Sequence, residues 1–300
     1  MEKKENQFKI ITSKNGIDVV EDEELGYAHV TPLPSAETLT KLYEDEYYQL
    51  DKKEYLERNQ RDEEWNNLNH QDKFDFFEEQ LGRKGSILDI GSGFGHFIAF
   101  GKNIGWATKG IEPSKIACEY ANNDFKVGTF NGFYNEETAA LLGLFDVVHL
   151  RNVLEHLPNP LEVLELCKKN LKEDGIICVS VPNDFSPFQK IANQELDLGE
   201  WWVVPNHHLN YFNPTSLERV LKKVGYEPIR KEASFPLTMF LMMGDNYIRD
   251  GELGRICHEK RKAFDLQLSK FDNQLRRDIY QFFAEKNIGR ECIVYARKNN

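Results

Sequence analysis

SILDIGSGFGHF, residues Ser86 to Phe97, is the stretch that decides the fold of this chain. It begins with an apolar run of the kind found in strands buried on both faces, Ile87, Leu88 and Ile90. Three glycines at alternating positions follow, Gly91, Gly93 and Gly95. They permit a tight turn and the close approach of a ligand to the backbone. A helix predicted over residues 94–103 then directs its N-terminus at that ligand. The stretch predicts a loop that binds a nucleotide-containing cofactor.

The glycine spacing and Asp89 indicate which cofactor the loop binds. A pyrophosphate-binding loop has the spacing G-x-G-x-x-G, whereas here Gly95 comes one residue early. The carboxylate of Asp89 stands two residues before the first glycine, where it would repel a pyrophosphate. It suits a ligand that carries an ammonium and a sulfonium group. We therefore expect S-adenosyl-L-methionine as the cofactor.

Glu112 ends the next predicted strand, in the segment TKGIEPS. A carboxylate at this place can accept hydrogen bonds from both ribose hydroxyls of an adenosine. NAD sites use an acidic residue in the same way, so Glu112 alone does not separate the two cofactors. Pro113 and Ser114 follow, and we expect them beneath the adenosine, with Ser114 capping the next helix.

Three further motifs follow the glycine loop along the chain. They are FDVVHLRNVLEHLPNPLEV from Phe145, LKEDGIICVSVPN from Leu171 and HHLNYFNPTSL from His207. Together with the loop they resemble the class I S-adenosylmethionine-dependent methyltransferases. The last motif is similar to that of a subgroup with ubiquinone-pathway O-methyltransferases and deoxysugar C-methyltransferases. The resemblance runs from about residue 86 to 234, half of the chain, and is specific for cofactor and reaction rather than for the methyl acceptor.

The resemblance implies where the cofactor lies. The family contacts adenine at the end of the third strand, and Asn131 offers a side-chain carbonyl there in place of the aspartate of many members. Arg151 and Asn152 follow the fourth strand and are expected beside the methionine part, where Arg151 could pair with a carboxylate. The residues predicted to bind the cofactor are Asp89, Gly91, Ser92, Gly93, Gly95, Phe97, Glu112, Pro113, Ser114, Thr129, Phe130, Asn131, Arg151 and Asn152.

The predicted catalytic residues are His208 and His207. Methyl transfer is a displacement from a good leaving group, so the enzyme mainly aligns the reactants and excludes water. A hydroxyl acceptor must still lose its proton, and an imidazole with a pKa of about 6.5 can take it near neutral pH. The resemblance places His208 on the subgroup's recurrent histidine. Adjacent side chains of an extended chain face opposite ways, so we expect less of His207. A histidine that merely orients this loop is the alternative.

Glu155 and His156 raise the question of a metal. Some ubiquinone-pathway relatives have E-x-x-E-H at this place and can bind a divalent ion there, whereas this chain reads N-V-L-E-H. The loss of one acidic oxygen weakens a magnesium-type site. We therefore expect no metal, and instead the packed start of a helix with a hydrogen-bonded histidine.

Aromatic side chains before the loop and near the two histidines could line an acceptor pocket or simply pack. They are Tyr47, Tyr48, Trp65, Trp201, Trp202 and Tyr211. The apolar segment FPLTMFLMM from Phe235 is expected to form a pocket wall or the contact of a homodimer.

The alternation of short apolar strands and amphipathic helices predicts an α/β fold with a doubly wound, seven-stranded, mostly parallel sheet, the Rossmann-like methyltransferase fold. Residues 1–82 are interpreted as an N-terminal helical cap over the cofactor, and residues 83–300 as the catalytic domain. A helical insertion over about 236–288 precedes the last strand, predicted over 290–297. The family resemblance implies that this strand lies antiparallel beside the sixth.

Composition excludes several classes of partner. The formal charge of −11 and the pI near 5.3 disfavour nucleic acid. No apolar run reaches the roughly 20 residues of a membrane helix. The first nine residues, MEKKENQFK, lack an apolar signal core, and five scattered cysteines form neither a zinc nor a disulfide pattern. We expect a cytoplasmic protein.

The sequence therefore predicts a methyltransferase that acts on a small molecule, with a hydroxyl of a sugar, sugar nucleotide or other metabolite as the acceptor. Two alternatives stay open. One is an NAD-dependent oxidoreductase or epimerase, which Asp89 and the early Gly95 disfavour. The other is a catalytically silent S-adenosylmethionine-binding regulatory protein.

Overall fold

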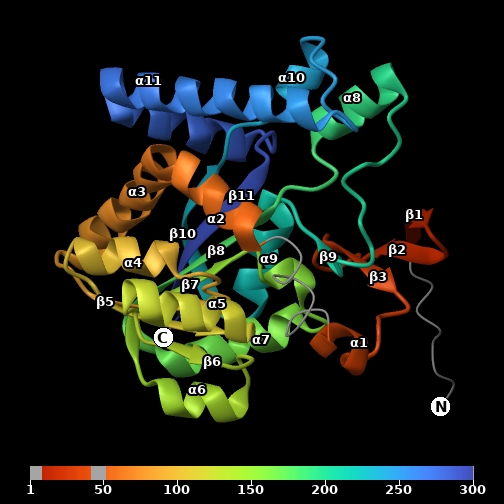
Figure 1. Ribbon diagram of the computed structural model, residues 1–300. Helices are drawn as coiled ribbons and strands as arrows, with labels where there is room; N and C mark the ends of the chain where they lie inside the picture. The colour runs from red at the N-terminus through yellow and green to blue at the C-terminus, as the bar shows by residue number, and fades with distance from the viewer. Residues whose placement is uncertain (1–8, 42–51, 300) are drawn as a thin grey trace, which may run out of the picture.

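The computed structural model describes residues 9–41 and 52–299, which form a large seven-stranded sheet and a small four-stranded one (Figure 1). Tyr47 and Tyr48, two of the predicted pocket residues, lie outside the described residues. No helix of the described segments is both long and apolar enough to cross a membrane.

The large sheet has the strand order β10-β11-β8-β7-β4-β5-β6. Its strands are β4 (Ser86–Ile90), β5 (Ala107–Glu112), β6 (Thr129–Asn131), β7 (Phe145–Arg151), β8 (Leu171–Pro182), β10 (Tyr226–Ala233) and β11 (Glu291–Lys298). Strand β11 pairs antiparallel with both β8 and β10, whereas the pairs among β4 to β8 are parallel. This confirms the predicted doubly wound sheet. The carboxyl ends of its parallel strands meet at one edge, where ligands bind in such folds.

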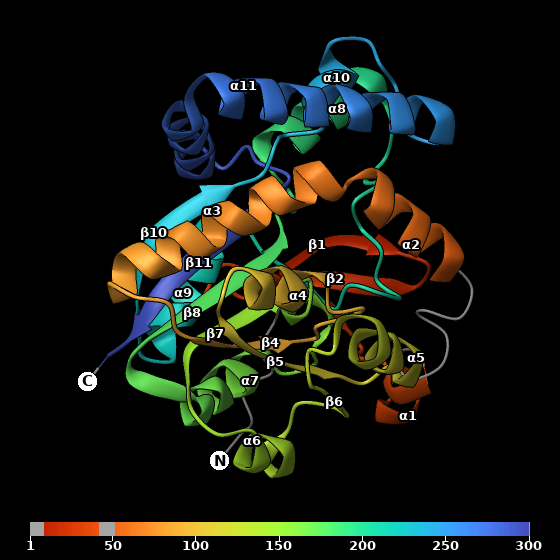
Figure 2. The same cartoon turned by 60° about the vertical axis from the view of Figure 1, so that its left-hand side comes forward.

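Helices cover both faces of this sheet (Figures 1 and 2). One face carries α3 (Glu63–Leu81), α4 (His96–Asn103) and α5 (Lys115–Tyr120), and the other carries α6 (Glu136–Leu142), α7 (Pro160–Cys167) and α9 (Pro214–Lys223). Successive residues of β7 show why both faces are apolar. Val147 packs in the core beneath α3 and α4, Val148 packs in the core of the opposite face, and neither is exposed.

The N-terminal region contains both strands and helices. Its strands β1 (Lys9–Lys14), β2 (Ile17–Glu21) and β3 (Ala28–Thr31) form an antiparallel sheet with β9 (Asn210–Tyr211), and its helices are α1 (Ala36–Lys41), α2 (Lys52–Arg61) and α3. The pairing of β3 with β9 joins this region to the segment that follows the two predicted histidines. The short loop before β9 is thereby held in place.

The insertion between β10 and β11 contains α10 (Met239–Met242) and α11 (Gly251–Glu285), which lies across α3 (Figure 2). Buried polar contacts join the two helices. Trp65 Nε1 donates to Asp265 Oδ2 (2.6 Å), and Lys262 Nζ pairs with Asp62 Oδ1 (2.6 Å). Trp65, predicted as a possible pocket residue, therefore fastens the insertion to α3.

The apolar segment that begins at Phe235 packs mainly within the insertion. Phe235 and Phe240 form a cluster with Cys257 and Tyr280 of α11. Met243, at the end of the segment, is 62% exposed.

A further helix, α8 (Pro187–Leu196), follows β8 and has no counterpart among the predicted elements. Ser186 caps it, since its hydroxyl accepts from the backbone of Gln189.

Candidate functional site

The glycine loop takes the conformation that its sequence predicts. Gly91, Gly93 and Gly95 have φ values of +71°, +53° and +79°, a region that residues with a side chain rarely adopt. The backbone N–H groups of Gly91 and Ser92 both donate to the carbonyl of Ile111, at 2.9 and 3.2 Å. These bonds fix the loop over the carboxyl ends of β4 and β5.

Side chains pack tightly beneath two of the glycines. A Cβ at Gly91 would lie 2.5 Å from Cγ2 of Val153, and one at Gly95 would lie 2.9 Å from Cβ of Ala121. Val153 follows β7, so the loop also contacts the segment that carries Glu155 and His156. The side chain of Ser92 turns inward, since its Oγ is 2.5 Å from the place of a Cβ at Gly110. Ser92 therefore presents its backbone to the ligand side of the loop.

The carboxylate of Glu112 lies beside this loop and is buried. Its Oε2 accepts from the N–H of Gly93 and its Oε1 from the N–H of Ser114, each at 2.8 Å. Burial raises the pKa of Glu112 to about 7, although the two backbone N–H groups favour the charged form and act to lower the pKa. Each oxygen keeps a second lone pair, so the group can still accept two hydroxyl donors.

The end of β6 is arranged around Asn131. Its Nδ2 donates to the carbonyls of Glu112 and Pro113, both at 3.0 Å, so its side-chain oxygen is left to accept. The neighbouring Phe130 is 37% exposed, whereas Thr129 is buried. Ser114 caps α5, as predicted, since its hydroxyl accepts from the N–H of Ala117.

Asp89 pairs with His149, a histidine of β7. His149 Nδ1 lies 2.7 Å from Asp89 Oδ1, and both side chains are buried. The two residues are direct neighbours in the pairing of β4 with β7. Phe97, predicted to contact the cofactor, packs against the His149 ring at 4.2 Å between centroids, with the two rings tilted by 33°. The pairing register of β4 and β7 was the signal that could have found His149.

Arg151 and Asn152 lie at the carboxyl end of β7, as predicted, and both are exposed. Arg151 Nη2 pairs with Glu291 Oε1 at 3.3 Å. Asn152 has a φ of +53°, and its N–H donates to the carbonyl of Ser180. The chain therefore turns sharply after β7, and this turn brings the next residues, Val153 to His156, over the glycine loop.

Glu155, His156 and His208 form a cluster next to this turn. His156 Nδ1 donates to the carbonyl of His207 (2.7 Å), so Nε2 is the accepting nitrogen of its neutral ring, 3.8 Å from Glu155 Oε1. The rings of His156 and His208 are 5.2 Å apart. Glu155 Oε2 and His208 Nδ1 are buried without a hydrogen-bond partner. His207 is exposed and contributes its backbone carbonyl.

The charges of this cluster differ from those expected of a histidine base. Burial, reinforced by His156, His207 and Arg290, lowers the pKa of His208 to about 3. Burial raises the pKa of Glu155 well above its usual value. His208 is therefore neutral at physiological pH and a weak base, contrary to the expectation that it titrates near pH 6 to 7. The ionised form of Glu155 is a stronger base than an ordinary glutamate carboxylate, because burial disfavours its charge.

The same cluster bears on the prediction that no metal binds. That prediction rested on Asn152, which replaces the first acidic residue of the E-x-x-E-H pattern. The structure brings His208 to the remaining pair, and the possible ligand atoms of Glu155, His156 and His208 lie within 4.8 Å of one another. Two imidazoles and one carboxylate are ligands suited to zinc or another transition metal rather than to magnesium.

Asp184, just after β8, is a second buried acid that sequence reasoning missed. Its Oδ2 is buried without a hydrogen-bond partner. Burial raises the pKa of Asp184 to about 7, although the positive charge of Arg290 acts to lower it. It also raises the pKa of Glu155 and of Tyr211. The signal that could have found it is its place at the carboxyl end of a parallel strand, where polar groups reach a ligand.

The predicted aromatic residues of this region pack on one another. Trp202 and Tyr211 belong to the core of the small sheet, and Phe185 contacts both rings edge-on, at 5.7 and 5.8 Å between centroids. Trp201 stands edge-on to Trp202 at 4.7 Å and is half-buried. Packing in this core therefore accounts for the places of Trp202 and Tyr211, and Trp201 packs against the same core.

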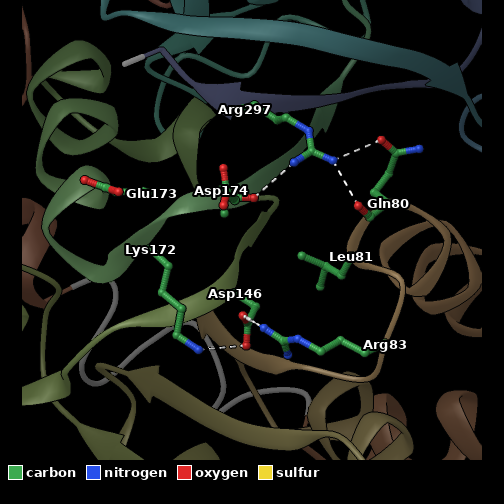
Figure 3. A pocket seen from close by; sticks show the side chains of 9 residues that line it. Gln80, Leu81, Arg83, Asp146, Lys172, Glu173, Asp174 and Arg297 are labelled. Atoms are coloured by element: carbon green, nitrogen blue, oxygen red, sulfur yellow. Dashed lines mark hydrogen bonds and ion pairs between the residues drawn. The ribbon is translucent and has the colours of Figure 1, made fainter.

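A hollow of about 440 Å³ lies at the opposite edge of the large sheet (Figure 3). It is lined by Gln80, Leu81, Arg83, Asp146, Lys172, Glu173, Asp174, Gly175 and Arg297. Arg83 and Lys172 both pair with Asp146, at 2.6 and 3.0 Å, and Arg297 donates to the carbonyl of Gln80 (3.0 Å). The three cationic side chains of the hollow, Arg83, Lys172 and Arg297, are therefore bound to other protein groups. The hollow is separate from the glycine loop.

Curated relatives match part of the chain. The ubiquinone biosynthesis O-methyltransferase of Actinobacillus pleuropneumoniae serotype 5b (strain L20) is 32% identical over 112 residues, 34% of this chain and 47% of the relative. The protein of the same description from Caulobacter vibrioides is 28% identical over 157 residues, 50% of this chain and 61% of the relative. The chain thus spans about half the length of the curated relatives it matches.

Solved structures share the fold. The plantazolicin methyltransferase BpumL, in complex with SAH, has a TM-score of 0.52 and 14% identity over 88% of this chain and 95% of its own. A SAM-dependent methyltransferase from Archaeoglobus fulgidus has a TM-score of 0.50 and 16% identity over 81% of this chain and 99% of its own.

The sequence model of the family described as "Methyltransferase domain" matches residues 58–231, more than half of the chain. Those residues include the glycine loop, Glu112, the cluster around Glu155, five strands of the large sheet and most of a sixth. With the confirmed fold, this match shows that the chain belongs to the class I S-adenosylmethionine-dependent methyltransferases and that its cofactor is S-adenosyl-L-methionine.

Proposed function

We propose that this protein transfers a methyl group to a hydroxyl of a small molecule such as a sugar, a sugar nucleotide or another metabolite. The observation that carries the proposal is the cluster of Glu155, His156 and His208. Glu155 follows Val153 by two residues, and the Val153 side chain packs against Gly91 of the cofactor loop. A proton acceptor beside the cofactor loop is needed for a hydroxyl acceptor and superfluous for a neutral amine. The relatives named as O-methyltransferases support the same choice of acceptor atom.

The residues of the loop fit S-adenosylmethionine, which supplies the methyl group and, as a sulfonium, the leaving group. Gly91, Gly93 and Gly95 hold the loop in a left-handed backbone conformation, and a Cβ at Gly91 or Gly95 would collide with the protein packed against the loop. Glu112 would accept from the ribose hydroxyls, and the Asn131 carbonyl from the exocyclic amine of adenine, with Phe130 against the ring. Asp89 would face the ammonium group, with Phe97, Arg151 and Asn152 around the methionine part. Ser92, Pro113, Ser114 and Thr129 would shape the adenosine side through their backbone.

The cluster would act on the acceptor in one step. His208, the most exposed of its members, accepts the hydrogen bond of the hydroxyl and aligns its oxygen. As the oxygen forms its bond to the methyl carbon, its proton passes to His208, whose other ring nitrogen gives its proton to Glu155 in the ionised form. The raised pKa of Glu155 makes that carboxylate a stronger base than an ordinary glutamate. The proton later leaves to water. His207 shares in this through its backbone carbonyl, which fixes the tautomer of His156.

The other two functions considered for this chain have no support from the fold or the family. An oxidoreductase would need a pyrophosphate beside Asp89, and the family match is to methyltransferases. A silent cofactor-binding protein would not need two buried, unpartnered acceptor atoms beside the loop.

The proposal is tested by measuring S-adenosylhomocysteine formation with paired acceptors. Hydroxyl compounds, including phenols, sugars and sugar nucleotides, are compared with amine analogues of the same skeleton. We expect product with a hydroxyl compound and at least tenfold less with its amine analogue. Equal or greater turnover of the amine would overturn the proposed acceptor, and no turnover with any compound while the cofactor binds would favour the silent protein.

A further inference from the structure

The pair of Asp89 and His149 lies at the centre of the large sheet, directly before the glycine loop. The strands β4 and β7 bring the two residues opposite each other, and Nδ1 of the imidazole is 2.7 Å from Oδ1 of the carboxylate. The His149 ring is held from the other side by Phe97, on the first turn of α4. The imidazole therefore has one orientation available to it, with Nδ1 toward Asp89.

The hydrogen bond of this pair has a defined direction. An ionised carboxylate has no proton to give, so His149 Nδ1 is the donor and Nε2 is the unprotonated nitrogen of a neutral ring. Burial keeps the ring neutral, because it lowers the pKa of His149 despite the nearby carboxylate. The pair thus holds one negative charge. A protonated histidine at the same place would cancel the charge of Asp89.

We propose that His149 is a positioning residue for the cofactor: it holds the Asp89 carboxylate in place, without neutralising it, to receive the ammonium group of S-adenosylmethionine. The inference rests on the proposed role of Asp89. A carboxylate side chain rotates freely about its last bond unless one oxygen is anchored. Anchoring Oδ1 to a neutral donor leaves the other oxygen in a fixed direction with its charge intact, and a preorganised partner binds more tightly than a mobile one.

Calorimetry with two ligands separates this role from a merely structural one. S-adenosylhomocysteine carries the ammonium group, whereas 5′-methylthioadenosine has the same adenosine and sulfur but no amino-acid part. In His149→Leu, which removes the donor, we expect affinity for S-adenosylhomocysteine to fall about tenfold and that for methylthioadenosine to change less than threefold. His149→Asn has about the same size as the leucine variant and places an amide N–H near the position of Nδ1, so it should keep most of the wild-type affinity.

His70 provides the matched control. It is a buried imidazole of α3 that packs edge-on against the same Phe97, at 5.2 Å between ring centroids, and burial likewise lowers its pKa. It has no hydrogen bond to Asp89. His70→Leu should therefore alter packing as His149→Leu does and leave the ratio of the two affinities at its wild-type value.

Several results would overturn the proposal. Equal losses for both ligands in His149→Leu would show a structural role, as would an asparagine variant no better than leucine. If the leucine variant does not fold, His149→Gln replaces it, since its donor lies one bond further out and should not restore the affinity ratio. Asp89→Asn separates the role of His149 from the role of Asp89. A changed ratio in Asp89→Asn with none in the His149 variants sinks this inference alone, whereas an unchanged ratio in Asp89→Asn sinks the role of Asp89 itself.

Discussion

Val153 occupies the space that a side chain at Gly91 would need, with its Cγ2 at 2.5 Å from the position of a Cβ. Two separated segments of the chain, the glycine loop and the turn after β7, are thus locked together by one close contact. The contact links the cofactor loop to the segment that carries Glu155 and His156.

We predict that Gly91→Ala weakens binding of S-adenosylhomocysteine at least tenfold, because the new Cβ displaces the loop and the φ of +71° is strained for alanine. Adding Val153→Ala should restore part of the affinity, since it removes the clash and leaves the strain. Gly16→Ala is the control, with a φ of +77° and no atom within 4 Å. Calorimetry that finds no rescue by Val153→Ala would show that the contact does not shape the loop.

A second prediction concerns pH and Glu112. With a pKa of about 7, its carboxyl is largely protonated at pH 6, and a protonated group loses acceptor capacity for the ribose hydroxyls. Affinity for S-adenosylhomocysteine should rise between pH 5.5 and 8 and level off above the pKa, by roughly tenfold between pH 6 and 8. Glu112→Gln should bind more weakly and with a flatter profile. A wild-type profile as flat as that of the variant would contradict the ribose contact.

His208 should make the protein sensitive to acid. Its pKa is about 3 when folded and about 6.5 when unfolded, so between these values the unfolded chain takes up a proton that the folded chain does not. Folding stability is therefore lost as pH falls below 6.5, by at most about 2 kcal/mol at pH 5 from this residue. His208→Gln should lose less stability between pH 7 and pH 5, as measured by urea unfolding. Equal losses in both proteins would show that His208 is not held neutral.

The cluster itself is tested by turnover. Glu155→Gln and His208→Ala should each lower kcat by roughly 10² to 10⁴ and leave cofactor affinity unchanged, because alignment and proton removal are lost while the loop is intact. His207→Ala should have a much smaller effect, since its backbone carbonyl is kept. A kcat of the His207 variant as low as that of His208→Ala would reverse the assignment.

A metal at the same cluster gives a different result. If Glu155 acts as the proton acceptor, dialysis against a chelator leaves kcat unchanged, and added zinc inhibits by occupying the ligands within 4.8 Å of one another. Loss of activity on chelation, restored by one equivalent of zinc or another divalent ion, would show instead that the cluster holds a resident metal.

The sequence predicted the sheet because each strand of the large sheet is a short apolar run beside a turn or a helix signal. It also predicted the loop, since glycines at alternating positions have few other uses. The pair of β3 with β9 could not be predicted, because β9 has two residues and depends on a partner about 180 residues away. Local pattern carries no information on such a pairing.

For the candidate site too, the sequence predicted the residues that share a local pattern and missed those that depend on distant neighbours. The cofactor residues follow one another along the chain and carry a local pattern. His149 looked like one more residue of a buried strand, and its partner Asp89 lies 60 residues away. The neutral state of His208 depends on burial among Glu155, His156 and the loop, which a sequence pattern does not contain.

Methyl transfer to a hydroxyl, with the cluster as proton acceptor, can be followed directly by isotope labelling. The protein is incubated with S-adenosylmethionine carrying a ¹³C-methyl group and a metabolite extract, and the products are resolved by NMR. We expect a methyl ether in the small-molecule fraction, formed one-to-one with S-adenosylhomocysteine. With Glu155→Gln this ether should be nearly absent. A label found on nitrogen or carbon, or an ether formed equally well by Glu155→Gln, would contradict the proposed function.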